Sequence, residues 1–225
     1  MFLLAALFSL IQVAQAEESY VSLQRHALAA TAKDEKSLDS LAKYLDRGRP
    51  RTFYDKRVKF WTRNWAGDYA TALEIYAWIA SRIHYVDSDG EQYEPSDPEA
   101  QWVLTTRAGV CHDYAVLYHA LAKKAGLDVE YVYGTARTDS ADVPGPHAWN
   151  AVCIGGEWRM VDSCWARDDV TGKVDYKWFL LSPERFTETH LPWEEEFGHQ
   201  PCCAYLQNMD RKKLQQIRQK MGLRR

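Results

Sequence analysis

The chain has little net charge and no long apolar run in its interior. Its 225 residues include 28 Lys and Arg and 31 Asp and Glu, a formal net charge of −3. So small a charge does not favour a polyanionic or polycationic partner, and we expect no nucleic-acid ligand. No internal segment reaches the roughly 20 apolar residues that a membrane-spanning helix needs, so we expect no integral span in the mature chain. Apolar residues make up 46% of the sequence, which predicts a globular core and argues against disorder.

Cysteine is scarce. The five copies are Cys111, Cys153, Cys164, Cys202 and Cys203. An odd number of cysteines in an exported chain predicts at least one thiol outside any disulfide, and Cys111 is the natural choice. The pairing of the other four stays open, although a bridge between the adjacent Cys202 and Cys203 would be strained.

The N-terminus carries the one apolar block, from Phe2 to Ile11, followed by Ala14-Gln15-Ala16 and two glutamates. This order is typical of a secretory signal peptide, although only the α-amino group precedes the block as positive charge. We therefore predict a signal peptide over residues 1–16, cleaved after Ala16, and a secreted or periplasmic protein. A buried N-terminal helix is the alternative.

The remaining sequence divides into three predicted parts. Residues 17–66 form an N-terminal helical segment, whose second helix has an apolar face made by Leu38, Leu41, Ala42 and Leu45. Residues 67–193 form a core that begins with a helix over about residues 69–83. Residues 194–225 form a tail with a basic helix, which presents Leu214, Ile217 and Met221 on one side.

Within the core, capping residues and alternation predict the order of elements. Asp97 as N-cap with Pro98 at N1 starts a helix that ends near Arg107, and Gly109 makes a turn. The next helix runs from Cys111 to a terminal glycine at Gly126. Strands are predicted over 129–133, on both sides of Gly155-Gly156 and over 176–181, and a short helix opens at Ser182.

The hairpin at Gly155-Gly156 makes a spatial prediction. A two-residue turn of glycines places Ile154 opposite Glu157. Counting outward, Trp149 faces Asp162 and His147 faces Cys164, and opposed residues share a face of the sheet. His147 and Asp162 are then diagonal neighbours, close enough for their side chains to meet. A one-residue bulge would break this register.

Together these residues predict a nucleophilic site made of Cys111, His147 and Asp162. A helix N-terminus and a neighbouring imidazolium both favour a thiolate, so we expect a Cys111 thiolate paired with protonated His147. Asp162 would fix the tautomer of the histidine. The thiolate attacks a carboxamide or peptide carbonyl, His147 protonates the leaving amine, and a thioester remains. No cofactor is expected.

Other interpretations of these residues stay open. Asp162 could instead cap the end of a strand, and a metal site from Cys111, His147 and Cys164 is conceivable, although no usual ligand spacing supports it. His199 near Cys202 and Cys203 is a weaker metal candidate. For the oxyanion, the Cys111 N–H is one natural donor, and Tyr85, Gln92 and Tyr93 are guesses for a second. His112 and Asp113 are expected to lie beside the site without a catalytic role.

Three motifs resemble the transglutaminase-like superfamily: Gly109 to Ala115, His147-Ala148-Trp149-Asn150, and Trp158 to Asp162. Flanking stretches, among them Trp178 to Phe186 and His190-Leu191-Pro192-Trp193, are similar to its kyphoscoliosis-peptidase and cytokinesis-protein-3 branch. The resemblance implies an α+β fold of the papain-like, transglutaminase-core type. In that fold N-terminal helices precede a Cys helix packed on an antiparallel sheet that carries the His and Asp.

Members of that family act as peptidases, amidases or protein cross-linkers, and some are inactive scaffolds. Two departures are Ser163-Cys164-Trp165, where the branch usually has a small residue, Thr and Trp, and His112-Asp113 directly after the cysteine. We therefore predict an exported thiol enzyme that acts on protein or peptide amide bonds, with hydrolysis favoured over transamidation. A catalytically inactive protein-binding module is the alternative, and the oligomeric state stays open.

Overall fold

The computed structural model describes residues 36–46, 52–55, 60–63, 65–86, 96–137, 144–167, 173–193 and 201–223. The predicted signal peptide and the first predicted helix of the N-terminal segment lie outside these residues. The two short stretches at 52–55 and 60–63 form an antiparallel hairpin, β1 (Thr52–Asp55) and β2 (Phe60–Arg63). The predicted N-terminal segment is therefore not wholly helical.

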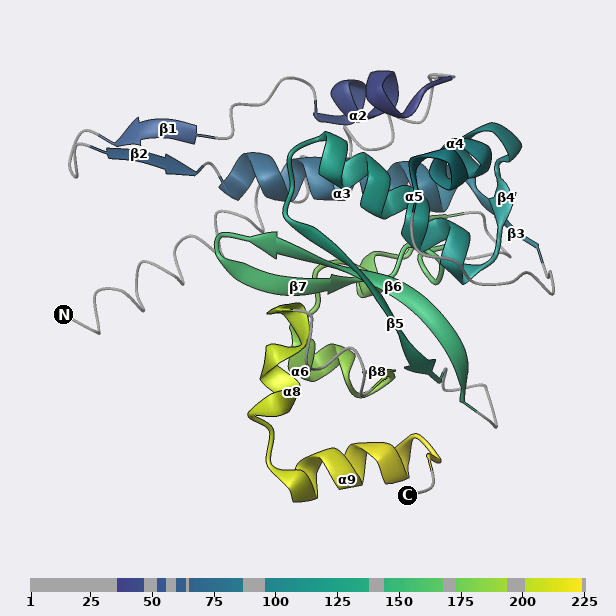
Figure 1. Ribbon diagram of the computed structural model, residues 1–225, viewed down its shortest axis with the longest axis vertical. Coiled ribbons are helices and arrows are strands. Elements are labelled where there is room, and N and C mark those ends of the chain that lie inside the picture. The colour runs from purple at the N-terminus through teal and green to yellow at the C-terminus, as the bar shows by residue number, and fades with distance from the viewer. Residues whose placement is uncertain are drawn as a thin grey trace.

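Four helices gather on one side of the molecule (Figure 1). They are α2 (Leu38–Asp46), α3 (Trp65–Arg82), α4 (Asp97–Thr106) and α5 (Cys111–Lys124). The α2 helix buries the apolar face that its sequence predicts. The α3 helix begins four residues before the predicted start, and Asp68 lies buried in its first turn. Ser96, and not Asp97, caps α4, because the Ser96 side chain accepts the Glu99 N–H at 3.4 Å.

The sheet has four antiparallel strands in the order β7-β6-β5-β8. They are β5 (Val129–Ala136), β6 (Gly145–Ile154), β7 (Glu157–Val161) and β8 (His190–Pro192). The α5 helix packs against β5 and β6, and the Asn150 amide donates to the Ala115 carbonyl at 3.1 Å. The predicted α+β fold, with the Cys helix on an antiparallel sheet, is confirmed.

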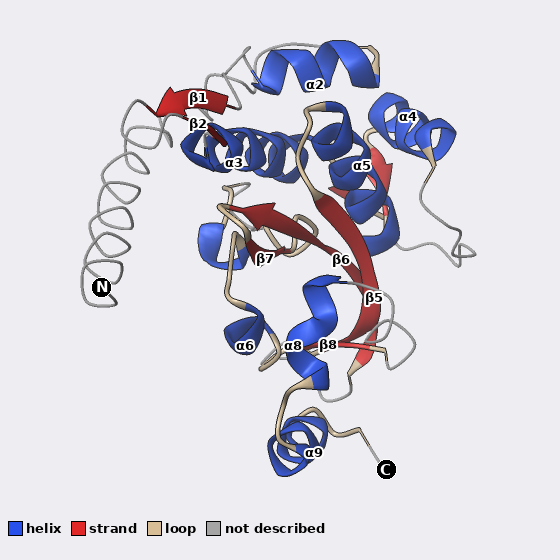
Figure 2. Ribbon diagram, turned by 60° about the vertical axis from the view of Figure 1, so that its left-hand side comes forward, coloured by secondary structure: helices blue, strands red, loops and turns tan. Residues whose placement is uncertain are grey.

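Three helices after β7 lie on the opposite side of the sheet from α3 and α5 (Figure 2). They are α6 (Pro183–Phe186), α8 (Ala204–Gln207) and α9 (Arg211–Lys220), with a 3-10 turn, η2 (Pro201–Cys203), before α8. Ser182 caps α6 as its sequence predicts. Leu214 and Ile217 pack against a small cluster of Leu191, Leu206 and Met221, so the basic tail helix docks on the domain.

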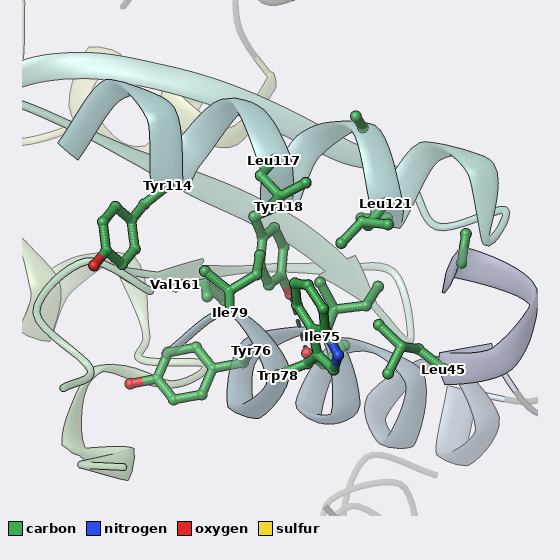
Figure 3. Packing of buried hydrophobic residues seen from close by; sticks show 14 of the residues in the cluster. Leu45, Ile75, Tyr76, Trp78, Ile79, Tyr114, Leu117, Tyr118, Leu121 and Val161 are labelled. Carbon is green, nitrogen blue, oxygen red and sulfur yellow. Dashed lines mark hydrogen bonds between the residues drawn. The ribbon is translucent and has the colours of Figure 1, made fainter. Parts of the chain in front are cut away.

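The main core lies where α3, α5 and α2 meet (Figure 3). Ile75, Ile79, Leu117 and Leu121 are fully buried there. Burying one such side chain stabilises the fold by about 1.5–3 kcal/mol. The tyrosines of this core pair their hydroxyls with backbone: Tyr114 donates to the Ile83 carbonyl at 2.8 Å. This hydrogen bond ties the first turn of α5 to the residue that follows α3, and so helps to hold the start of α5 in place.

One predicted strand is wrong. Tyr176 to Leu181 is not a strand: it contains a 3-10 helix, η1 (Tyr176–Trp178), and only Leu181 bridges to Met160. Leu180 has φ of 53°, which interrupts an extended chain, and Phe179 packs against the ring of Tyr76 instead.

The turn before α5 also differs from its prediction. Arg107, and not Gly109, adopts the left-handed conformation, with φ of 60°, and its guanidinium lies 4.5 Å from the ring of Trp78. Gly109 belongs instead to a short parallel pair of strands, β3 (His84–Tyr85) and β4 (Ala108–Gly109). None of the helices described here combines the length and the apolar character needed to cross a bilayer.

Candidate active site

Cys111 occupies the first position of α5, as its sequence predicts. Val110 precedes it as N-cap but has no polar side chain, so Asp113 takes over the capping role. Its Oδ2 accepts the Val110 N–H at 2.8 Å. Because the Asp113 side chain folds back against this turn, residue 109 has no room for a side chain. A Cβ on Gly109 would lie 2.3 Å from the Asp113 Cβ. The Cys111 thiol is therefore held at a helix start whose backbone N–H groups favour negative charge.

The Gly155-Gly156 hairpin has the predicted register. Both glycines have positive φ, of 63° and 86°, as a tight turn between strands requires. Ile154 pairs with Glu157, and the ladder continues without a bulge to Asn150 and Val161. Asp162 directly follows the last paired residue of β7, and His147 lies three residues before Asn150 on β6. The simple turn therefore delivers His147 and Asp162 to neighbouring positions.

Asp162 uses its two carboxylate oxygens for two tasks. Oδ2 accepts a hydrogen bond from Nε2 of His147 at 2.9 Å. Oδ1 accepts the backbone N–H groups of Cys164 at 2.9 Å and Trp165 at 3.1 Å. Asp162 is therefore both the partner of His147 and the cap of the turn that ends β7, the two roles that its position allowed.

His147 is buried, with 5% of its surface exposed. Burial lowers the pKa of His147, but the charge and hydrogen bond of Asp162, together with an interaction with the Cys111 side chain, raise it to about 9. Because Nε2 is bound to Asp162, Nδ1 is the ring nitrogen left to face Cys111. His147 is thus protonated at neutral pH, between a carboxylate and a sulfur.

The pKa of the Asp162 carboxyl moves in the opposite direction. Burial alone would raise this pKa, but the positive charge and hydrogen bond of His147, with a further hydrogen bond from His190, hold it well below its usual range. Asp162 and His147 therefore form a buried pair of a carboxylate and an imidazolium. Cys111, which interacts with His147, is half-buried.

Aromatic rings enclose this pair. The ring of Trp165 lies 4.7 Å from that of His147 at an interplanar angle of 31°, and Trp149 stacks at 6.2 Å. The same group of rings surrounds His190, a residue with no predicted role. Its Nε2 lies 3.2 Å from Asp162 Oδ2. The short strand β8 that carries His190 has no alternating pattern to predict it, and the only signal in the sequence was the resemblance of the stretch from His190 to Trp193.

Cys164 does not face His147 as the extended register predicts. The strand β7 ends at Val161, and residues 162–165 turn away from it. The Cys164 side chain packs against the main core cluster instead. The conceivable metal site of Cys111, His147 and Cys164 is therefore not assembled. All five cysteines carry thiols, and the Sγ atoms of the buried Cys202 and Cys203 lie 3.6 Å apart.

One other group has a spacing that a metal ion could span. Within the described ranges, donor atoms of His147, Asp162 and His190 all lie within 4.8 Å of one another. Their contacts are those of hydrogen bonds, at 2.9 and 3.2 Å. The second carboxylate oxygen is already occupied by two backbone N–H groups, and the three side chains are buried. This donor set fits a proton-sharing network better than a metal centre.

Two further predictions concern the rim of the site. Tyr85, a guessed oxyanion donor, is 53% exposed and lies on β3, paired with Gly109; Gln92 and Tyr93 lie outside the described residues. His112 turns away into a polar network, with Nε2 2.7 Å from Glu99 Oε1 and Nδ1 2.8 Å from the Tyr131 hydroxyl. This network ties α4, α5 and β5 together, so His112 helps to fix the start of the Cys helix.

Comparison with known proteins shows a family likeness. Residues 56–163 match the family model of the transglutaminase-like superfamily. Human kyphoscoliosis peptidase is 27% identical over 188 residues, which cover 75% of this chain and 27% of that protein. Cytokinesis protein 3 of Saccharomyces cerevisiae is 24% identical over 149 residues, which cover 58% of this chain and 17% of that protein.

Structural comparison gives weaker likenesses. The crystal structure of a candidate cysteine protease from Cytophaga hutchinsonii aligns with a TM-score of 0.42 and 26% identity, over 61% of this chain and 39% of that one. The chain spans about a quarter of the human relative's length, 27%. The matched segment contains Cys111, His147 and Asp162, so the three predicted side chains lie within the part that carries the family likeness.

Proposed function

We propose that the transglutaminase-like domain of this chain is a thiol acyl-transfer enzyme in which Cys111 is the nucleophile, His147 the acid and base, and Asp162 the residue that orients His147. The observation that carries the proposal is the hydrogen bond between His147 and Asp162, together with the interaction of His147 with the Cys111 side chain at the start of α5. A buried histidine with a pKa near 9 is charged at neutral pH, and an imidazolium favours a thiolate beside it.

The reaction that follows from these roles has two stages. The Cys111 thiolate adds to an amide carbonyl, the C–S bond forms, and the carbonyl oxygen becomes an oxyanion. The Cys111 N–H at the helix start is a natural donor to that oxyanion. As the C–N bond breaks, His147 gives its proton to the departing amine. A thioester on Cys111 remains, and neutral His147 can then take a proton from the molecule that resolves it.

Within this scheme we propose that water resolves the thioester, so that the enzyme is a peptidase or amidase. Water is always present, whereas no amine-binding site is evident in the sequence. A protein or peptide is the proposed substrate. We also propose that residues 1–16 are removed after Ala16 and that the mature protein works outside the cytoplasm.

The decisive experiment follows alkylation of Cys111 by iodoacetamide across pH. A thiolate paired with His147 reacts well below about pH 8, whereas an ordinary thiol with a pKa near 8.5 reacts slowly there. The same protein is then incubated with a peptide library, with Cys111→Ala as the control. Alkylation like that of ordinary cysteine, together with no cleavage above that of the Cys111→Ala control, would indicate an inactive binding module.

Hydrolysis and transamidation are separated by their products. A glutamine-containing protein is incubated with a fluorescent primary amine and wild-type enzyme. Hydrolysis gives peptides or free carboxylates and no labelled protein, whereas covalent labelling that depends on Cys111 would contradict hydrolysis.

A further inference from the structure

His190 lies on the same face of the sheet as His147. In the ladder, Gly134 of β5 pairs with His147 on one side and with Pro192 of β8 on the other. Directly paired residues share a face, and His190 is two residues from Pro192, so it shares that face too. Gly134 lies between the two strands, where a Cβ would lie 2.3 Å from the Leu191 carbonyl oxygen. The missing side chain allows β8 to approach closely.

The contacts of His190 define its protonation. Nε2 lies 3.2 Å from Asp162 Oδ2, and Nδ1 lies 2.8 Å from the Thr189 hydroxyl. The Asp162 carboxylate can only accept, so Nε2 carries a proton. The Thr189 hydroxyl has one proton and two acceptors within reach, the Phe186 carbonyl at 3.3 Å and His190 Nδ1 at 2.8 Å. Donation over the shorter contact lets a neutral ring satisfy both of its nitrogens. The geometry favours one tautomer, with its proton on Nε2.

The surroundings of His190 favour the neutral ring. The side chain has no exposed surface, and its ring stacks on Phe186 at 3.9 Å. Burial lowers the pKa of His190 to about 4, outweighing the attraction of Asp162, and the nearby charge of His147 lowers it further. At neutral pH, therefore, one of the two histidines that share Asp162 is charged and the other is not.

We propose that His190 is a positioning residue that donates a neutral hydrogen bond to Asp162 and so limits how strongly this carboxylate holds the proton of His147. This inference rests on the proposed function, in which His147 must release that proton to a leaving amine. A carboxylate oxygen that accepts two hydrogen bonds directs less of its charge at either donor. His190 thus tunes the catalytic acid without touching the substrate.

The other titratable groups around the pair come from different elements. Cys111 on α5 interacts with His147. Tyr76 on α3 is close enough to Asp162 to feel its charge; its pKa is raised well above its ordinary value by burial, then by Asp162 and Asp175, so it stays neutral. Its hydroxyl donates to the Asp175 carbonyl at 2.6 Å and not to Asp162. Among the described groups, His190 is thus the neutral side chain that donates to the shared oxygen.

The test compares the pH profile of kcat/KM in three variants. His190→Phe keeps a ring beside Phe186 but removes the donor. We expect the alkaline limb to move upward by roughly half to one pH unit, because Asp162 then acts on His147 alone. His190→Gln can place an amide N–H near the position of Nε2, so we expect the limb to return toward that of the wild type.

Leu191→Ala is the matched control for lost packing in the same strand. A merely structural role for His190 would lower activity in both His190→Phe and Leu191→Ala without moving the limb in either. That result, or a downward movement in His190→Phe, would overturn the proposal.

A second measurement needs neither a folded variant nor an active enzyme. In the wild-type chain with ¹⁵N-labelled histidine, NMR should show the His190 ring neutral between about pH 5 and about pH 9, protonated on Nε2 and unprotonated on Nδ1. Titration near its ordinary value of 6.5, or a proton on Nδ1, would overturn the proposal. Loss of the proposed function would instead appear as absent cleavage, with these resonances unchanged.

Discussion

Replacing Asp162 with asparagine removes one negative charge from the buried pair while keeping nearly the same shape. The backbone N–H groups of Cys164 and Trp165 already point at Oδ1, so the asparagine keeps its carbonyl oxygen there. Its NH₂ group then faces Nε2 of His147, where the wild type has an acceptor. A donor thus meets a donor, and His147 must turn to the tautomer that places its proton on Nδ1, toward Cys111.

The size of the effect follows from the pKa of His147. Burial lowers this pKa and Asp162 raises it to about 9 from an ordinary value of 6.5. Without the charge of Asp162, burial lowers this pKa and the Cys111 side chain raises it, so we expect a value near the ordinary 6.5. The proton affinity of the ring then falls by about 300-fold, or about 3 kcal/mol. We expect kcat/KM near neutral pH to fall by at least about 100-fold, since the charged histidine is the proposed acid.

The assay combines cleavage kinetics with alkylation of Cys111, read by mass spectrometry. In Asp162→Asn, alkylation below about pH 8 should slow to that of an ordinary thiol, because the imidazolium that supports the thiolate is gone. Glu157→Gln is the matched control, since Glu157 lies on the same hairpin but is exposed. A thermal melt establishes that both variants fold. Asp162→Asn with cleavage and alkylation rates within about twofold of wild type would show that Asp162 does not hold the charge on His147, because a loss of about 3 kcal/mol must lower the rate.

Four further outcomes follow from the same geometry. Wild-type kcat/KM should fall as pH rises through about 9, because His147 loses the proton that it gives to the leaving amine; a rate that stays level to pH 10 would exclude His147 as the acid. The raised pKa of His147 also stabilises the fold below about pH 6.5, and this contribution, about 3 kcal/mol at most, should be lost as pH rises through about 9; urea unfolding at a series of pH values measures it. The lowered pKa of His190, about 4, acts in the opposite range, so stability should also decline as pH falls from about 6.5 toward 4, and a curve that is flat there would show that His190 is not buried neutral. Gly134→Ala should destabilise the domain by about 1–3 kcal/mol, since its Cβ would meet the Leu191 carbonyl oxygen at 2.3 Å, and an unchanged melting temperature would mean that β8 lies elsewhere.

Much of the site was predictable because it depends on local rules. The Gly155-Gly156 turn fixes a register that ends at Asn150 and Val161, and Asp162 follows directly, within 2.9 Å of His147. The position of Cys111 at a helix start follows from the turn before it and the apolar pattern after it. Their roles in catalysis stay predictions. The prediction for Cys164 was wrong because it extended the ladder beyond the residue where β7 ends.

Local patterns specify the elements whose geometry is set by neighbours along the chain: the hairpin register, the caps of short helices and the apolar faces of α2 and α9. Which distant strand closes the sheet beside β5 is visible only in the folded molecule. That choice depends on packing between residues more than 50 positions apart, such as Gly134 and Pro192, and local patterns do not encode it. The pairing of β8 with β5 brings His190 to Asp162. A strand of three residues is stable only on the sheet to which it pairs, so its position is a property of the folded domain.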